Sequence, residues 1–155
     1  MLLCSIATCT QPWEFPLGEE ITPDQFDLLF TLKAPDPWPA EARVQVALCM
    51  RDEANFYYAD FVGGKVFLGW CAGGKRSPLS APVALAERES EEGFILYEIA
   101  IQRRSRLLQL VCDGRRLTTA YDGRLAAGKV AVVATGGLEV QELTPQPIGE
   151  VYLDD

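Results

Sequence analysis

The sequence predicts an all-β fold, an antiparallel β-sandwich of two sheets, and three observations support this. Short segments rich in β-branched and aromatic residues recur along the 155-residue chain. Glycine-containing turn signals separate these segments at the close spacing that is typical of sandwiches and barrels. No convincing amphipathic helix interrupts the series, and residues 79–88 are the only competing segment.

The central element is a predicted hairpin over residues 54–71, with the sequence ANFYYADFVGGKVFLGWC. Aromatic and β-branched side chains occupy both arms, which suits a pleated, half-buried surface. Gly63 and Gly64 join the arms, because a Gly-Gly pair accepts the positive φ angles of a tight turn without steric cost. Phe56 and Trp70 are predicted to belong to the core.

The N-terminal part predicts three further strands. Residues 2–8 form a short strand, which a loop over residues 11–20 follows. Residues 25–33 and 42–51 both alternate apolar with polar side chains, and the prolines between them exclude regular ladder bonding. The predicted core-facing residues of these two strands are Phe26, Leu28, Phe30, Leu32, Val44, Val46, Leu48 and Met50, and those that face away in the second strand are Arg43, Gln45, Ala47, Cys49 and Arg51.

The C-terminal part predicts six strands, which brings the total to about eleven. Asp113-Gly114 is a strong hairpin signal, because both residues tolerate a type I′ turn. In the segment FILYEIAIQ the inward residues are Ile95, Tyr97, Ile99 and Ile101, and the outward ones are Glu98, Ala100 and Gln102. The six predicted strands cover residues 82–86, 94–102, 106–112, 115–121, 128–135 and 137–143.

The order of these motifs resembles the concanavalin A-like lectin/glucanase superfamily, in its laminin G-like and 3-keto-glycoside-hydrolase-like branches. The motifs are N-F-Y-Y, a glycine turn, a second strand, the alternating L-Y-E-I-A-I, a strand ending in D-G, and finally G-K-V-A-V-V-A. The resemblance covers roughly Phe26 to Leu143 and implies a jelly-roll sandwich. Because this fold hosts lectins, hydrolases and spacer modules alike, the resemblance predicts fold more than activity.

Composition limits the possible functions. A net charge of −8 argues against binding to nucleic acid or to an anionic membrane, and no apolar run approaches the roughly 20 residues of a membrane span. The absence of histidine excludes Ser-His and Cys-His nucleophile pairs and histidine-ligated metals. We expect one domain over residues 1–155. The alternative is that this domain is the N-terminal module of a longer protein, since Asp154-Asp155 stands where a second domain of such families would begin.

The five cysteines form no C-x-x-C pair, and their number is odd. We expect buried thiols at Cys49, Cys71 and Cys112, with a hidden disulfide as the alternative. The N-terminal segment with Cys4 and Cys9 lacks the basic region of a signal peptide, so we expect a first strand there. The compartment stays open between the cytoplasm and an extracellular location with an upstream signal.

Two candidate chemical sites are weighed against simpler interpretations. The resemblance to retaining glucanases draws attention to Glu87, Glu89 and Glu91, whose alternate spacing would place carboxylates on one strand face. This run lacks β-forming residues, so a solvated loop is expected. Calcium would need converging oxygens, and the candidates at turns and strand ends are Asp52, Asp60, Asp113 and Asp122. Turn chemistry explains the last two without an ion.

A sugar site requires an aromatic platform and planar polar groups that bond to hydroxyls. Outward polar residues are predicted to line one sheet face, with tyrosines nearby, although the same pattern is typical of a solvated sheet surface. The candidate ligand-binding residues are Arg43, Gln45, Arg51, Asn55, Tyr57, Glu98, Gln102 and Tyr121. The cluster Arg103-Arg104-Arg106 is expected at a turn tip, as a solubilising or interdomain contact.

The sequence therefore favours a non-catalytic carbohydrate-binding or structural module, with a glycan or another protein module as its partner. One alternative is a carbohydrate-active hydrolase like the 3-keto-glycoside group. The other is a protein-interaction or oligomerisation domain. No catalytic residue, metal ligand or cofactor is assigned, and the oligomeric state is left open.

Overall fold

Eleven antiparallel strands make up the part of the chain that the structure, a computed structural model, describes, namely residues 25–125 and 128–147. In chain order they are β1 (Gln25–Pro35), β2 (Arg43–Asp52), β3 (Asn55–Val62), β4 (Lys65–Ala72), β5 (Lys75–Pro78), β6 (Val83–Ala84), β7 (Phe94–Arg104), β8 (Leu107–Cys112), β9 (Arg115–Tyr121), β10 (Lys129–Ala134) and β11 (Glu139–Pro147).

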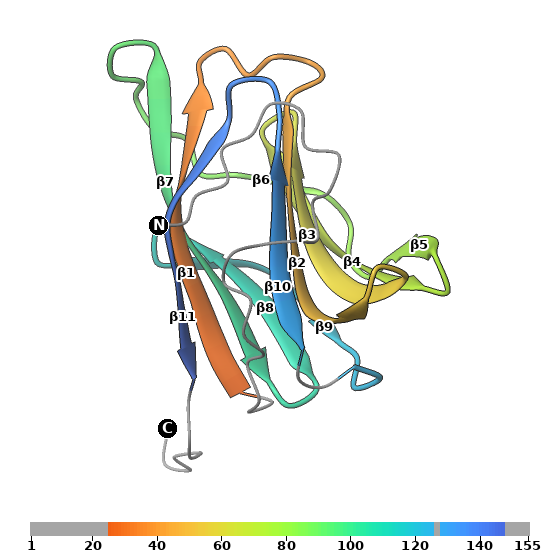
Figure 1. Cartoon of the computed structure of the whole chain (residues 1–155). Coiled ribbons are helices and arrows are strands. Elements are labelled where there is room, and N and C mark those ends of the chain that lie inside the picture. Colours follow the sequence, from red (N-terminus) through yellow and green to blue (C-terminus); the bar gives the residue numbers. More distant parts are fainter. Residues whose placement is uncertain (1–24, 126–127, 148–155) are drawn as a thin grey trace.

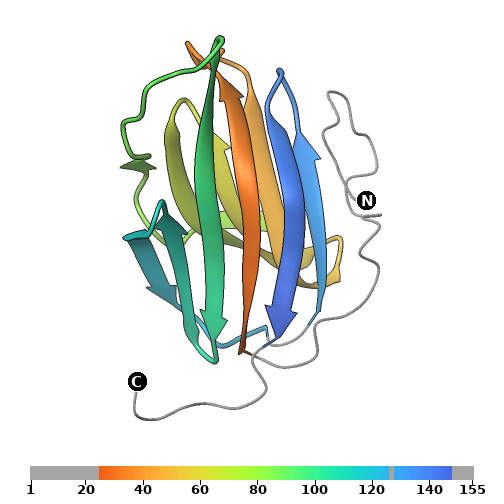
Figure 2. The same ribbon diagram turned by 90° about the vertical axis from the view of Figure 1, so that its left-hand side faces the viewer.

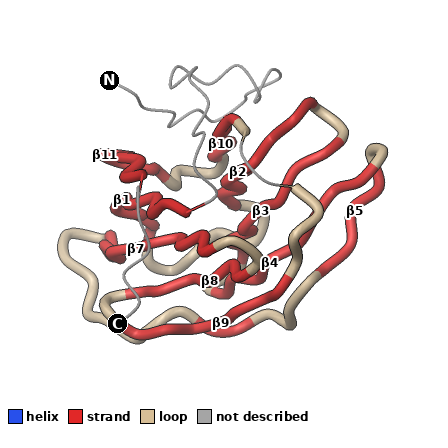
Figure 3. The backbone as a smooth tube through the Cα atoms, turned by 90° about the horizontal axis from the view of Figure 1, so that it is seen from below, coloured by secondary structure: helices blue, strands red, loops and turns tan. Residues whose placement is uncertain are grey.

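The strands form two sheets that pack face to face (Figures 1 and 2). One sheet has five strands in the order β11-β1-β7-β8-β9. The other has six, in the order β10-β2-β3-β4-β5, with β6 pairing to Lys65 and Val66 at the start of β4. The view along the strands in Figure 3 shows the two layers. The predicted antiparallel two-sheet sandwich is confirmed.

The core lies between the sheets and is built by alternation. In β1 every second residue is buried, from Phe26 to Ala34. Phe30 of the five-stranded sheet meets Phe61 of the six-stranded sheet edge to face, with ring centroids 6.1 Å apart. Each such buried side chain contributes roughly 1.5–3 kcal/mol, so the period of two in the sequence fixes the inner face of each sheet.

Two turns show why the hairpins close where the sequence predicts. Gly63 and Gly64 have φ angles of 62° and 77°, and Asp113 and Gly114 have 52° and 82°. Positive φ at both central residues is the type I′ geometry, whose twist matches that of the flanking strands. Both predicted hairpins are confirmed.

Some sequence predictions need correction or lie outside the described residues. The strand β5 was not predicted, because its sequence KRSP lacks β-forming residues. Cys49, predicted to face away from the core, is 1% exposed. Ala47 does face away, beside its register partner Tyr58, although it is 0% exposed. The register of β2 against β3 shifts after Leu48, and Cys49 has a φ of 51°, as at a β-bulge. The predicted strand over residues 2–8, Cys4, Cys9 and Asp154-Asp155 lie outside the described residues.

Cys49, Cys71 and Cys112 are buried free thiols, as predicted. Burial raises the pKa of the Cys112 thiol to about 11. The described part of the chain holds no helix long and apolar enough to cross a membrane.

Candidate functional site

The predicted ligand-binding residues do not share one face. Arg43, Gln45, Arg51, Asn55 and Tyr57 belong to the six-stranded sheet, and Glu98, Gln102 and Tyr121 belong to the five-stranded sheet. The prediction of one common sheet face is therefore wrong. Alternation told which side of a strand each residue occupies, but not which sheet the strand joins.

Arg43 and Gln45 lie together on the outer face of the six-stranded sheet. Cross-strand register places Gln45 beside Asp60 of β3. The Nε atom of Arg43 donates to Oδ1 of Asp60 at 3.2 Å, and Nη2 donates to Oδ2 of the same carboxylate. The side chain of Arg43 is 50% exposed while that of Asp60 is 3% exposed. A buried acceptor thus holds an exposed guanidinium in a fixed plane.

Arg76 of β5 extends the same network from the sheet edge. Its Nη1 donates to Oε1 of Gln45 at 2.7 Å. Its Cζ atom lies 5.1 Å from the ring centroid of Tyr58 and 5.4 Å from that of Phe56. A guanidinium over aromatic rings is stabilised by the ring quadrupole. We call Arg43, Gln45, Tyr58, Asp60 and Arg76 the outer network.

Gly69 makes room for the ring at the centre of the outer network. Its register partner is Tyr58, and a Cβ atom on Gly69 would lie 2.3 Å from Cζ of that ring. Tyr58 also meets the half-buried Phe67 edge to face at 6.0 Å. Only a residue without a side chain lets the tyrosine lie flat across β4. Figure 1 shows β3 and β4 sweeping outward toward β5 at their lower ends, so this face is curved.

The charged and buried surroundings of the outer network shift the pKa values of Arg43 and Tyr58. The hydrogen bond and attraction of Asp60 raise the pKa of Arg43 and outweigh the effect of its burial. Burial raises the pKa of Tyr58, and the nearby Arg76 opposes this. The face therefore exposes two guanidinium groups, those of Arg43 and Arg76, over a buried carboxylate, amide and phenol. The two guanidinium groups are planar donors that suit neighbouring hydroxyls of a polyol.

Sequence reasoning did not assign Tyr58, Asp60 or Arg76 to a sugar site, and it considered Asp60 only for calcium. Asp60 carried a usable signal, because a carboxylate inside a strand of aromatic and β-branched residues requires a partner. Tyr58 lies two residues before Asp60 and thus on the same face. Arg76 could not be placed, since its strand was not predicted.

Other predicted binding residues have structural roles. Asn55 accepts a hydrogen bond from the backbone N–H of Gly73 at 3.0 Å and donates to Asp52 at 2.9 Å, so it ties two turns together. Arg51 is exposed near the end of β2. Tyr57 is 0% exposed and points into the sandwich, away from Arg43 and Gln45.

Glu98 and Gln102 lie on the outer face of the five-stranded sheet. Gln102 accepts a hydrogen bond from Nε2 of Gln109 at 2.7 Å, and Thr31 approaches Glu98 at 3.4 Å. A shallow depression of about 480 Å³, lined by Leu29, Glu98 and other residues of this face, lies beside them. The alternating polar residues give it the character of a solvated sheet surface.

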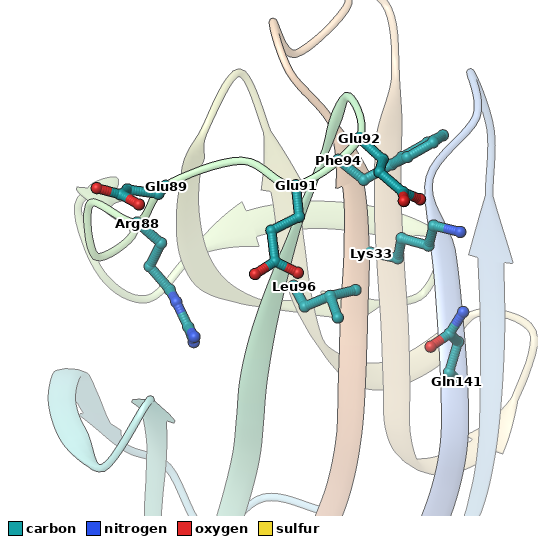
Figure 4. A pocket seen from close by; sticks show the side chains of 8 residues that line it. All are labelled: Lys33, Arg88, Glu89, Glu91, Glu92, Phe94, Leu96 and Gln141. Atoms are coloured by element: carbon teal, nitrogen blue, oxygen red, sulfur yellow. The ribbon is translucent and has the colours of Figure 1, made fainter.

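The glutamate run lines a larger hollow of about 520 Å³ (Figure 4). Lys33 of β1 lies over the ring of Phe94, with Nζ 4.3 Å from the centroid. Residues 87–93 are exposed, as expected of a solvated loop. Figure 4 shows the carboxylate of Glu89 pointing away from that of Glu91. These two carboxylates therefore do not face each other across a bond to be cleaved, as a glycosidase pair does.

Arg103 is not at an exposed turn tip, contrary to the sequence prediction. It is 1% exposed, and its Nη2 donates to the carbonyl oxygens of Asp122 and Leu125, both at 2.8 Å. Its Cζ lies 4.7 Å from the ring centroid of Tyr57. The alternation of β7 points Arg103 inward, where the loop after β9 supplies acceptors.

Asp122 connects this buried arginine to the surface. Its Oδ1 accepts a hydrogen bond from the hydroxyl of Tyr57 at 2.5 Å, and both its oxygens accept from Arg124. Burial raises the pKa of Asp122, but the hydrogen bonds from Arg124 and Tyr57 outweigh it and hold the pKa at about 2. Arg124 in turn stacks on Trp70, with Cζ 3.5 Å from the ring centroid.

The aspartates considered for calcium each have donors of their own. Asp60 binds Arg43, Asp113 binds Arg88, and Asp122 binds Arg124. Within residues 25–125 and 128–147, no group of three or more cysteine, aspartate or glutamate side chains is placed to hold a metal ion. Calcium stays an untested prediction.

Comparison with known proteins places the fold. No protein-family model matches the chain, and no curated protein matches it in sequence. Among solved structures, the carbohydrate-binding module CBM66 from Bacillus subtilis is similar with a TM-score of 0.66 and 14% identity, over 83% of this chain and 78% of that one.

Two galectins are also similar. The galectin LEC-6 of Caenorhabditis elegans has a TM-score of 0.59 and 14% identity, over 91% of this chain and 94% of that one. A tetrameric galectin from the ball sponge Cinachyrella has a TM-score of 0.61 and 13% identity, over 83% and 98%. The fold is thus a jelly-roll sandwich of the concanavalin A-like type, as the sequence predicted. At these identities the likeness concerns the fold.

Proposed function

We propose that this protein is a carbohydrate-binding module whose ligand lies on the outer face of the six-stranded sheet. The observation that carries the proposal is the outer network, in which Arg43 and Arg76 are exposed but held by the recessed acceptors Asp60 and Gln45. Groups fixed in this way lose little conformational entropy when they bind hydroxyls. The likeness to a carbohydrate-binding module and to galectins supports this choice among the functions that the fold hosts.

The arrangement suits a saccharide better than an extended peptide. A guanidinium presents donors in one plane, and neighbouring hydroxyls of a sugar ring can accept two of them. Phe67, half-buried beside Asp60, offers an apolar edge for the C–H face of the ring. Arg43 and Arg76 make the ligand contacts in this proposal. The buried Gln45, Tyr58 and Asp60 hold these two arginines in place.

The test is a glycan-array screen of the purified protein, repeated with Arg76→Gln and with a matched control. Arg116→Gln removes the same charge from β9 on the other sheet, where Arg116 reaches Gln109 only at 3.5 Å. We expect Arg76→Gln to weaken binding of the array ligand by about tenfold, the worth of one charge-assisted hydrogen bond, and Arg116→Gln to leave it unchanged. A chelator arm tests whether calcium takes part.

Other outcomes favour the alternatives. A blank array would contradict the carbohydrate proposal and favour a protein-interaction module. Turnover of a bound glycan would contradict a purely binding role and favour a hydrolase. Equal loss of binding in both variants would show that general charge, and not the outer network, holds the ligand.

A further inference from the structure

A separate hollow of about 460 Å³ lies at the end of β9. It is lined by Arg106, Tyr121, Asp122, Gly123 and Arg124, and we call it the end hollow. Its residues come from the β7–β8 turn, from the last residue of β9 and from the loop after it, and none of them belongs to the outer network. Its volume falls in the range of small-ligand sites.

Two arginines give the end hollow its charge. The backbone carbonyl of Arg106 accepts a hydrogen bond from the backbone N–H of Asp122 at 2.8 Å. The guanidinium of Arg106 is exposed and has no hydrogen bond or ion pair with any residue that the structure describes. The side chain of Arg124 is 57% exposed, yet its guanidinium pairs with Asp122 and stacks on the ring of Trp70. Because Asp122 is already neutralised by Arg124, the free positive charge is that of Arg106. The net charge of −8 opposes the approach of an anion, so binding of an anion here would depend on this local, unpaired guanidinium.

An aromatic ring stands beside these cations. Tyr121 is 75% exposed, and Leu96 at 44% is the only other large apolar side chain classed as exposed in the described residues. An exposed tyrosine is the usual platform for the C–H face of a sugar ring. Guanidinium groups bind carboxylates with two parallel hydrogen bonds. The end hollow thus combines recognition elements for a sugar ring and for a carboxylate.

We propose that the end hollow is a second glycan subsite that binds an acidic sugar unit, with Tyr121 under the ring and Arg106 on its carboxylate. The choice of a saccharide rests on the proposed carbohydrate-binding function, whereas the preference for an anion rests on the end hollow alone. Gly123 keeps the site open, because a Cβ atom there would lie 3.0 Å from Cγ of Arg106.

The experiment measures calorimetric binding of tri-galacturonate to the full chain. Its uncharged methyl ester and a sulfated galactose trimer serve as comparison probes. We expect the methyl ester to bind about tenfold more weakly than tri-galacturonate. Arg106→Gln should weaken tri-galacturonate to the level of the ester, and Tyr121→Ala should weaken all three probes. Stronger binding of the sulfated trimer than of tri-galacturonate would overturn the assignment to a carboxylate.

Arg115→Gln is the matched control, because Arg115 is exposed at the opposite end of β9 and its loss changes the net charge equally. Equal weakening by Arg115→Gln and Arg106→Gln would overturn the proposal, since it would reveal general electrostatic attraction. The proposal would also be overturned if Arg76→Gln abolished binding of tri-galacturonate while Arg106→Gln left it intact, because the ligand would then lie on the outer network.

These arms separate the two proposals. If neutral glycans bind and tri-galacturonate shows no preference over its ester, the end hollow proposal alone fails. If neither neutral nor acidic glycans bind, both proposals fail.

Discussion

Gly69→Ala tests how the outer network is packed. In a strand interior, alanine is normally more stable than glycine by about 0.5–1 kcal/mol, because glycine loses more backbone freedom on folding. Here the new Cβ would lie 2.3, 2.5 and 2.7 Å from Cζ, Oη and Cε1 of Tyr58. The ring is 3% exposed and lies between Phe56, Phe67 and Arg76, so it cannot move aside freely.

The sign of the effect should therefore reverse. Overpacking of this kind costs about 1–3 kcal/mol, so we expect Gly69→Ala to lower the free energy of unfolding. In a Tyr58→Ala background the clash is gone, and the same substitution should raise the free energy of unfolding by about 0.5 kcal/mol. Urea denaturation of the four proteins of this cycle measures both steps.

If Gly69→Ala stabilises the protein in both backgrounds, Tyr58 does not lie across β4. A binding readout accompanies the cycle. Displacing the ring of Tyr58 should also weaken binding of the array ligand, because Arg76 lies over this ring.

Three further predictions concern the buried polar groups. Arg103→Met should destabilise the fold by about 3 kcal/mol in urea denaturation, because two carbonyl oxygens lose their donor; an equally stable variant would contradict this role. The pKa of the Asp122 carboxyl is about 2, below its ordinary value. The contribution of this ionised carboxylate to the free energy of unfolding is therefore fully present above pH 4 and is lost as the pH falls toward 2. Asp122→Asn should therefore show a shallower fall in unfolding free energy over that range than the parent protein, and an identical pH profile would contradict it. In a variant with Cys4→Ser and Cys9→Ser, a thiol reagent at pH 8 should label none of the three remaining thiols until urea is added, because all three are buried. Burial also raises the pKa of the Cys112 thiol to about 11, which keeps it protonated at pH 8. Labelling of the folded protein would contradict this prediction.

Local patterns predicted the fold well. Alternation in β1 and β7 identified the core-facing residues, because the period of two belongs to the strand itself. The turns at Gly63-Gly64 and Asp113-Gly114 were predictable for the same reason, since backbone conformation there depends on two residues. The concanavalin A-like topology followed from the order of these elements along the chain.

The candidate site was less predictable because it depends on partners distant in sequence. Glu98 and Arg43 show the same outward pattern, yet they belong to different sheets. Arg103 resembles its neighbours in the sequence, and only a loop 19 to 22 positions later explains its burial. Arg76 joined the outer network from a strand whose composition does not favour β-structure. No local pattern contains these pairings.

The missed strand has a consequence for how this protein behaves in a crowded solution. The outer edge of β4 is covered by two short pieces, β5 along Gly69–Ala72 and β6 along Lys65–Val66. An uninterrupted edge would offer another chain a row of unpaired peptide groups. Here two separate short strands form the edge of the sheet, and β5 contributes two cations and a proline to it. We therefore expect Arg76 to have a second effect besides its place in the outer network, because a cation on an edge strand disfavours pairing with the sheet of another molecule.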